Sequence, residues 1–209
     1  VKSRFEKAAG ELPMDDASRM ARAQDMGFDT KKEWYHGTPD NRDIIKDGFS
    51  TERYNKSPQD GPYFFSDKRS VANTYADKTR AWDHENANPE VISAFVKEGD
   101  SLVIDAQFRG VNIDAMKKGM SAEELAKVDR LINEAGDETL RTVPELYHHI
   151  DHVNGTISTD GLTIIARALG KDSVIVKNVR DDLAGGGQIS NVLAVPRAKN
   201  IRRPSAVFD

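Results

Sequence analysis

The chain has 209 residues, of which 38% are hydrophobic and 31% charged, and this composition fits one well-packed domain with a short extension. Its formal charge of -4, from 34 acidic and 30 basic residues, argues against the broad basic surface that drives nonspecific nucleic-acid binding. The lack of cysteine excludes disulfides, a thiolate nucleophile and cysteine-based zinc sites.

The sequence predicts a chain that stays in water. Its N-terminus lacks a basic stretch followed by an apolar core, and no apolar run is long enough to span a bilayer. We therefore expect a soluble, cytoplasmic protein that has no membrane partner and acts as a monomer.

A helix is expected ahead of the main domain. Residues 15–26 have apolar positions at helical spacing, with Pro13 before them and Gly27 directly after them. We assign residues 1–30 to an N-terminal helical extension and residues 31–209 to the main domain.

Short apolar runs then predict strands. They are Trp34 to His36, Pro62 to Phe65, Val91 to Val96, Leu102 to Ile104, Val174 to Val176 and Val192 to Val195. Between two of these runs, residues 70–81 place Val71, Ala72 and Tyr75 on one face, which predicts a helix packed on a sheet with Tyr75 pointing inward.

Residues 113–170 carry helical signals instead. Ser121 with Glu124 and Thr142 with Glu145 form two capping-box patterns. A third helical pattern ends at Gly170, where a left-handed residue is needed. This stretch is therefore predicted to be a helical insertion, and the irregular mixture of strands and helices indicates the α+β class.

Two groups of short motifs follow the first helix. The first is Tyr35-His36-Gly37-Thr38, followed by Ile44, Ile45 and Gly48-Phe49. The second is Tyr63-Phe64-Phe65-Ser66-Asp67, leading into a helix with Ala72, Tyr75 and Ala76.

In this order the motifs resemble the ADP-ribosyltransferase superfamily of the His-Tyr-Glu type, which includes diphtheria toxin and the poly(ADP-ribose) polymerases. The resemblance covers residues 33–76 well and the C-terminal part more loosely, where residues 200–203 and 206–209 are similar to the end of the transferase modules of phage-type polyvalent proteins.

The resemblance implies two small packed antiparallel sheets with the helical insertion, and NAD as a substrate without a metal. It also implies mono-ADP-ribosylation, with release of nicotinamide and transfer of ADP-ribose to an acceptor macromolecule, for which protein is preferred over nucleic acid. The protein would then act in the cytoplasm of a bacterial host or of a target cell. An inactive NAD-binding or partner-binding module and an NAD glycohydrolase are the alternatives.

The resemblance also implies roles for the first motif. His36 would bond the adenine-side ribose, the Gly37 backbone would hold the nicotinamide amide, and Thr38 would lie near the ribose. These contacts would hold the dinucleotide in a bent, reactive pose.

Aromatic rings suit the leaving group, because a pyridinium gains cation–π attraction from their faces. In the family, a strand ring and a helix ring share this role. The helix ring is Tyr75, and the strand ring is Phe64 or, after a one-residue slip, Tyr63 on the opposite face of the strand. Ser66 follows on the same strand and completes the predicted NAD-binding set.

The family places an acidic residue near the start of a late strand, where it stabilises positive charge on the sugar. Here the late strand, residues 192–195, is preceded by Gln188-Ile189-Ser190-Asn191, which holds no acid. Gln188 or Asn191 would take this catalytic place beside His36 and Tyr75, without supplying charge.

Other features favour ordinary structural interpretations. His148 and His152, with His149 between them, have zinc-chelating spacing on a helix, but an exposed helical surface is preferred. Residues 184–187 favour a flexible turn over a phosphate loop.

Asp181 and Asp182 adjoin that turn and would form part of it, although either could replace the missing acid. The basic residues between Arg197 and Arg203 favour a solvated strand end over a contact with phosphate.

Overall fold

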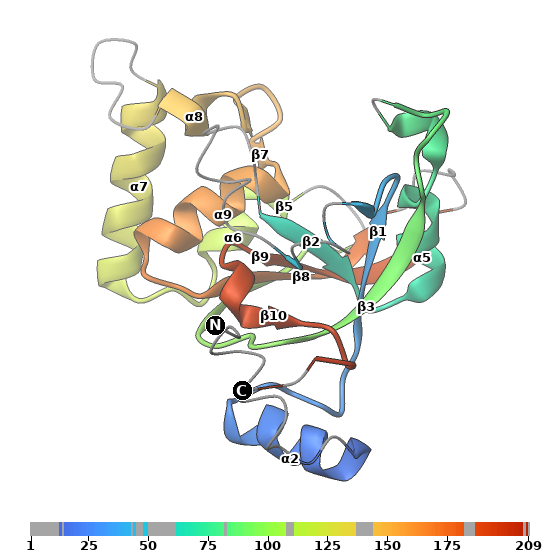
Figure 1. The fold of residues 1–209 in the computed structure, drawn as a ribbon. Helices are drawn as coiled ribbons and strands as arrows, with labels where there is room; N and C mark the ends of the chain where they lie inside the picture. Colours follow the sequence, from blue (N-terminus) through green and yellow to red (C-terminus); the bar gives the residue numbers. More distant parts are fainter. Residues whose placement is uncertain are drawn as a thin grey trace, which may run out of the picture.

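The computed structural model describes residues 13, 15–42, 44, 48–49, 62–81, 83–107, 111–136, 144–181, 187–206 and 208, and within them the chain has an α+β fold (Figure 1). One mixed sheet has the strand order β10-β3-β1-β2-β9-β8-β4. Its strands are β1 (Trp34–Thr38), β2 (Tyr63–Ser66), β3 (Glu90–Val96), β4 (Ser101–Asp105), β8 (Ser173–Arg180), β9 (Ile189–Val195) and β10 (Ile201–Arg202).

The prediction of two packed antiparallel sheets was wrong in one respect, because β4 and β8 pair in parallel within this sheet. Parallel neighbours need a long crossover, and the stretch predicted as an insertion provides it between these two strands. A separate three-stranded antiparallel sheet, in the order β5 (Val111–Asn112), β7 (Thr156–Ile157) and β6 (Ile150–Asp151), lies within that crossover.

The crossover is therefore not purely helical. It contains α6 (Ile113–Lys117), α7 (Ala122–Gly136), α8 (Pro144–Tyr147) and α9 (Thr159–Ala168), together with β5 (Val111–Asn112), β6 (Ile150–Asp151) and β7 (Thr156–Ile157). Strands of two residues carry too little periodicity to be found in a sequence.

Local signals in the crossover act as expected at two helix ends. The Ser121 hydroxyl accepts from the Glu124 N–H at 3.2 Å, and Glu124 accepts from the Ser121 N–H at 2.9 Å, so this capping box is confirmed. Thr142 of the second box lies outside the described residues. At the end of α9, Gly170 has a φ of 78° and the Lys171 N–H bonds the Ala166 carbonyl at 2.8 Å.

Two buried cores lie on the two faces of the large sheet. The helix-side core joins β4, β8 and β9 to α6, α7, α8 and α9, and includes Leu146, Leu162, Ile165 and Val174. The far-side core includes Trp34, Tyr63, Phe65, Ile175, Leu193 and Val195. Burial of each such side chain contributes roughly 1.5–3 kcal/mol.

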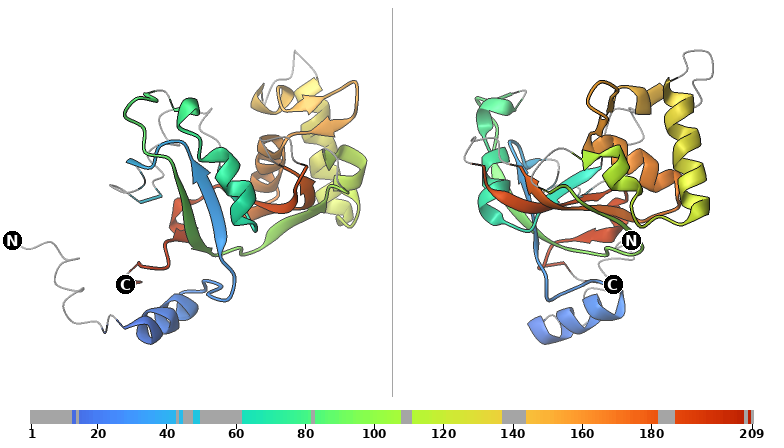
Figure 2. Two further views of the ribbon diagram at one scale, coloured as in Figure 1. Left: turned by 90° about the vertical axis from the view of Figure 1, so that its right-hand side faces the viewer. Right: turned by 180° about the vertical axis from the view of Figure 1, so that it is seen from behind.

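The helix α5 (Arg69–Tyr75) is shorter than predicted and ends at Tyr75. The Asp77 carboxylate then accepts from the N–H and the hydroxyl of Thr79, which starts a separate 3-10 turn at Lys78–Arg80. Tyr75 is thus the last helical residue. In Figure 2, α5 and the helices of the crossover stand over the same face of the sheet.

The N-terminal helix α2 (Asp16–Asp25) is confirmed, with the Asp15 side chain accepting from the Ser18 N–H as its cap. The helix ends at the predicted position, and Gly27 has a φ of 84°. Ala23 and Phe28 pack with Phe95 and Phe208, so the extension and the C-terminal segment share one small core.

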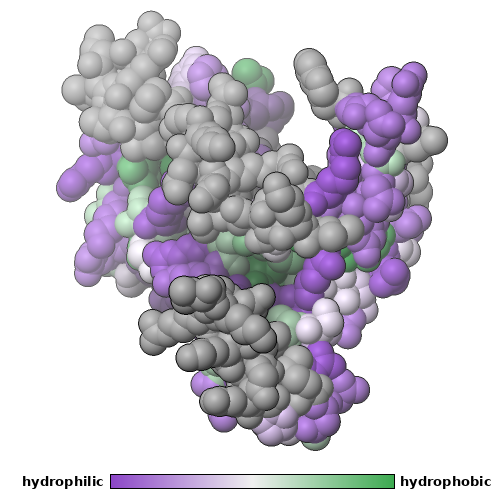
Figure 3. All heavy atoms as spheres, in the orientation of Figure 1, coloured by the Kyte–Doolittle hydropathy of each residue, from purple (hydrophilic) through white to green (hydrophobic). Residues whose placement is uncertain are grey.

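Figure 3 shows one face of the molecule, on which the described residues are mainly hydrophilic and apolar atoms gather near the middle. No helix within the described ranges has both the length and the apolar character needed to cross a bilayer.

Candidate functional site

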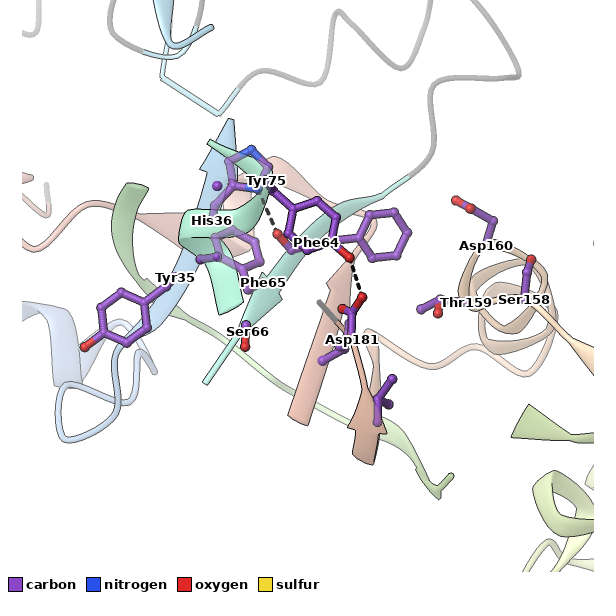
Figure 4. Close-up of a pocket in the computed structure, with 14 residues that line it drawn as sticks. Tyr35, His36, Phe64, Phe65, Ser66, Tyr75, Ser158, Thr159, Asp160 and Asp181 are labelled. Atoms are coloured by element: carbon purple, nitrogen blue, oxygen red, sulfur yellow. Dashed lines mark hydrogen bonds between the residues drawn. The ribbon is translucent and has the colours of Figure 1, made fainter. Parts of the chain in front are cut away.

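A cleft of about 460 Å³ lies between α5 and the start of α9, over the sheet (Figure 4). Such a volume is within the range of small-molecule sites. Its lining is Tyr35, His36, Gly37, Phe64, Phe65, Ser66, Ala72, Tyr75, Ser158, Thr159, Asp160, Val179, Asp181 and Val192. Residues from both motif groups of the sequence therefore meet at one opening.

Glycine at position 37 allows α5 to pack directly on β1. A Cβ on Gly37 would lie 1.8 Å from the Ala72 carbonyl oxygen and 2.9 Å from the Tyr75 Cβ. A side chain at this position would force α5 or β1 to shift, because the nearest atoms belong to the helix backbone and to a Cβ attached to it. The close approach fixes Tyr75 beside the strand that carries His36.

The His36 ring lies where β1 and β2 separate. The register between these strands pairs Tyr35 with Ser66, and the His36 Nδ1 then lies 2.8 Å from the Phe64 carbonyl oxygen. Since a carbonyl only accepts, Nδ1 must be the donor in this contact, and Nε2 is then the acceptor whenever the ring is neutral. Phe49 and Tyr63 contact the ring edge to face, with centroids 5.9 and 5.8 Å away.

Alternation along β2 separates the two candidate strand rings. Tyr63 is 6% exposed and packs in the far-side core, whereas Phe64 lines the cleft. In Figure 4 the Phe64 ring points toward the space in front of α9. The geometry therefore favours Phe64 over Tyr63 as the partner of Tyr75.

The remaining predicted binding residues divide in the same way. Ser66 lines the cleft, and its hydroxyl accepts from the Lys68 N–H at 3.1 Å. Thr38 is 6% exposed and is not among the lining residues, and its hydroxyl donates to the Asp40 carbonyl at 2.7 Å. Thr38 therefore shapes the turn after β1.

Gln188 and Asn191 are not among the residues that line the cleft. Gln188 is exposed and accepts a hydrogen bond from the Ser70 hydroxyl at 2.7 Å. The Asn191 amide donates to Asp67 at 2.6 Å and accepts from the Asn178 N–H at 3.1 Å. Both side chains thus connect neighbouring elements around the site.

Two carboxylates line the cleft, Asp160 from the first turn of α9 and Asp181 directly after β8. The Tyr75 hydroxyl donates a hydrogen bond to Asp181. The sequence favours a solvated turn at Asp181 over a replacement for the missing acid, and no motif in it points to Asp160. No lysine or arginine is among the described lining residues, so the cleft favours a cationic group.

His148 and His152 do not share a helix face, so the prediction of a helical surface was wrong, although both residues are exposed. The helix α8 ends at Tyr147, and His148 and His152 lie in turns on either side of β6. The Tyr147 ring lies against His152, with centroids 5.2 Å apart. Within the described part of the chain, no group of three or more metal-ligating side chains comes together.

The other features lie away from the lining of the cleft. Arg197 pairs with Asp172 at 3.2 Å, and Arg202 donates to the Ile201 carbonyl at 2.9 Å. Of the predicted glycine-rich turn, only Gly187 is among the described residues, and Asp182 lies outside them.

Comparison with known proteins gives no relative for this chain. A scan against models of protein families, a search of curated proteins and a search of solved structures found no match. A functional conclusion therefore depends on the chemistry of the cleft.

Proposed function

We propose that the cleft binds NAD, and that the protein is a mono-ADP-ribosyltransferase with a fold of the ADP-ribosyltransferase type. The observation that carries this proposal is the meeting of His36, Phe64 and Tyr75 at one opening. The Phe64 and Tyr75 rings, with Gly37 packed beneath the helix, are suited to a flat cationic ring. The His36 ring lines the same cleft but packs on Phe49, Tyr63 and Phe65, and it would contact the sugar.

The negative charge of the cleft would determine the orientation of the bound dinucleotide. Asp160 and Asp181 attract the positive nicotinamide ring, and they repel the pyrophosphate. The nicotinamide ribose therefore enters the cleft, and the phosphates stay toward its mouth. The same acidic lining disfavours a nucleic-acid acceptor, whose phosphates would meet these carboxylates, and so favours a protein acceptor.

His36 would fix the sugar. Its Nδ1 is held by the Phe64 carbonyl, so Nε2 has a defined direction in which to accept from a ribose hydroxyl. The backbone of Gly37 would bond the nicotinamide amide, which needs both a donor and an acceptor. The nicotinamide ring would also stack on the rings of Tyr75 and Phe64.

The reaction breaks the bond between the ribose C1′ and the nicotinamide nitrogen. The bonding electron pair leaves with the nitrogen, so nicotinamide departs neutral and positive charge develops on the sugar. A lone pair of the acceptor then forms a bond to C1′, and the acceptor loses a proton. NAD and a protonated acceptor thus give nicotinamide, the ADP-ribosylated acceptor and a proton.

Incubation with NAD labelled on the adenine side, with and without a cell lysate, tests this proposal. Transfer predicts nicotinamide release together with label on a macromolecule. Free ADP-ribose without a labelled macromolecule would identify an NAD glycohydrolase. Binding of NAD without nicotinamide release would identify a binding module, and absence of both would refute the proposed use of the cleft.

A further inference from the structure

The strand β8 contains a β-bulge beside the cleft. In its register with β9, Val176 faces Val192 and Val179 faces Ser190, so β8 uses one residue more than β9 over this step. Asn178, within the bulge, has a φ of 53°, a left-handed conformation that asparagine tolerates better than most residues.

Side chains hold the bulge in place. The Asn178 N–H donates to the Asn191 Oδ1 at 3.1 Å, and the Asn178 amide donates to both oxygens of Asp105, at 3.2 and 3.1 Å. Asn191 is in turn held by Asp67, through its backbone N–H at 2.9 Å and its amide at 2.6 Å. Strands β4 and β9 thus anchor the irregular segment of β8 directly, and Asp67, the residue after β2, supports it through Asn191.

The extra residue determines on which face of the sheet the Asp181 side chain lies. Before the bulge, Val174 and Val176 belong to the helix-side core and Ile175 to the far-side core. Regular alternation would place residue 181 with Ile175 on the far side. After the bulge, Val179 and Asp181 line the cleft instead.

The Tyr75 hydroxyl then orients the Asp181 carboxylate. Their hydrogen bond joins the last residue of α5 to the residue that follows β8 (Figure 4). Asp160 projects from α9 on the opposite wall. Asp181 is therefore the carboxylate that is hydrogen-bonded to Tyr75, the residue on whose ring the nicotinamide would stack.

We propose that Asp181 is the catalytic carboxylate of this site, brought to the cleft by the bulge and oriented by Tyr75. This inference rests on the proposed function. As the C1′–nitrogen bond breaks, positive charge spreads over the sugar, and a fixed anion beside the ribose stabilises that state more than the ground state. Asp181 forms no covalent bond and receives a hydrogen bond from a ribose hydroxyl.

Asp181→Asn in the full chain tests the role of the charge. The amide keeps the size of the side chain and can still accept from Tyr75, so folding and the shape of the cleft should persist. Asp129→Asn is the matched control, because it makes the same change on the outer helix α7, where Asp129 pairs with Lys117. Nicotinamide release and the dissociation constant for NAD are measured for the three proteins.

The inference predicts that Asp181→Asn lowers nicotinamide release by on the order of 100-fold, as loss of one preorganised electrostatic group does elsewhere. The NAD dissociation constant should change far less, and Asp129→Asn should match the wild type. Equal release by Asp181→Asn and the wild type would overturn the role of Asp181 and leave the proposed function standing. A wild type that binds no NAD, or binds it without turnover, would overturn both.

Discussion

The Ala72 carbonyl oxygen occupies the space that a side chain at position 37 would need, 1.8 Å from the ideal Cβ position of Gly37. This contact joins β1 to α5, and it determines where Tyr75 stands relative to His36. The geometry of the cleft therefore depends on a residue that has no functional group in its side chain.

Gly37→Ala should destabilise the protein by about 1–3 kcal/mol, because the new methyl group overpacks a contact with backbone. It should also weaken NAD binding, since α5 must move and carry Tyr75 with it. Urea unfolding and calorimetric titration with NAD measure the two effects. Gly119→Ala is the control, since Gly119 has a φ of 87° and open space around its Cβ position. This control should lose stability through strain alone and keep its NAD affinity.

Tyr75→Phe should separate stacking from orientation. The phenylalanine ring keeps the face for nicotinamide but cannot donate to Asp181. We expect nearly unchanged NAD affinity with slower nicotinamide release, whereas Tyr75→Ala should lower affinity by roughly tenfold through lost stacking, worth about 1.4 kcal/mol. A Tyr75→Phe protein with wild-type turnover would remove the orienting role from the hydroxyl.

Asn191→Ala should loosen the bulge of β8. The variant loses bonds to Asp67 and to the Asn178 N–H in a half-buried place, at a cost of about 1–3 kcal/mol. Nicotinamide release should fall because Asp181 is no longer held, while NAD affinity should fall less. Asn154→Ala offers a comparison, since it removes an amide bonded to a carboxylate in an exposed turn. The positioning role would be wrong if Asn191→Ala lowered stability without slowing release.

The crossover should lose stability at both extremes of pH through one ion network. Lys171 lies 3.1 Å from Glu124 and 3.1 Å from Asp100. The hydrogen bond from the Ser121 backbone N–H, and to a smaller extent the one from Lys171, lowers the pKa of Glu124 below its ordinary 4.5. The hydrogen bond to Glu124, and to a smaller extent the one to Asp100, raises the pKa of Lys171 above its ordinary 10.5. The stabilisation from Glu124 is present above pH 4.5 and is lost as the pH falls through its lowered pKa. That from Lys171 is present below pH 10.5 and is lost as the pH rises through its raised pKa.

Lys171→Met should therefore lower the free energy of unfolding at pH 7, and the difference from the wild type should shrink as Glu124 is protonated below pH 4.5. Denaturant unfolding at a series of pH values measures this difference. Lys127→Met, which breaks an exposed pair with Glu123 on the same helix as Glu124, should have a smaller effect at pH 7. A difference for Lys171→Met that stays constant down to pH 3 would contradict the network.

The sequence predicts the parts of this fold that depend on local chemistry. The apolar run from Leu102 to Ile104 lies within β4, and the capping box at Ser121 begins α7, because periodicity and caps act over a few residues. The order of the strands does not follow from such signals. The parallel pairing of β4 with β8 depends on a crossover whose path only tertiary packing decides.

The same distinction between local sequence signals and tertiary packing applies to the candidate site. His36, Gly37, Phe64 and Tyr75 lie in short motifs, and the structure brings them to one cleft. The sequence predicts a solvated turn at Asp181 because this residue adjoins the glycine-rich segment, and the bulge that brings it to the cleft is not visible in the sequence. One extra residue moves every later side chain to the other face, and the positive φ of Asn178 that accommodates it leaves little trace in the sequence.

Calorimetric titration with NAD tests most directly whether this cleft binds the dinucleotide. We expect one site in the wild type, weakened by roughly tenfold or more in both His36→Ala and Tyr75→Ala, which is the effect of losing one hydrogen bond or one stacked ring. His148→Ala, a change in an exposed turn, should bind as the wild type does. If the wild type did not bind NAD, or if all four proteins bound it equally, His36 and Tyr75 would not form an NAD site in this cleft.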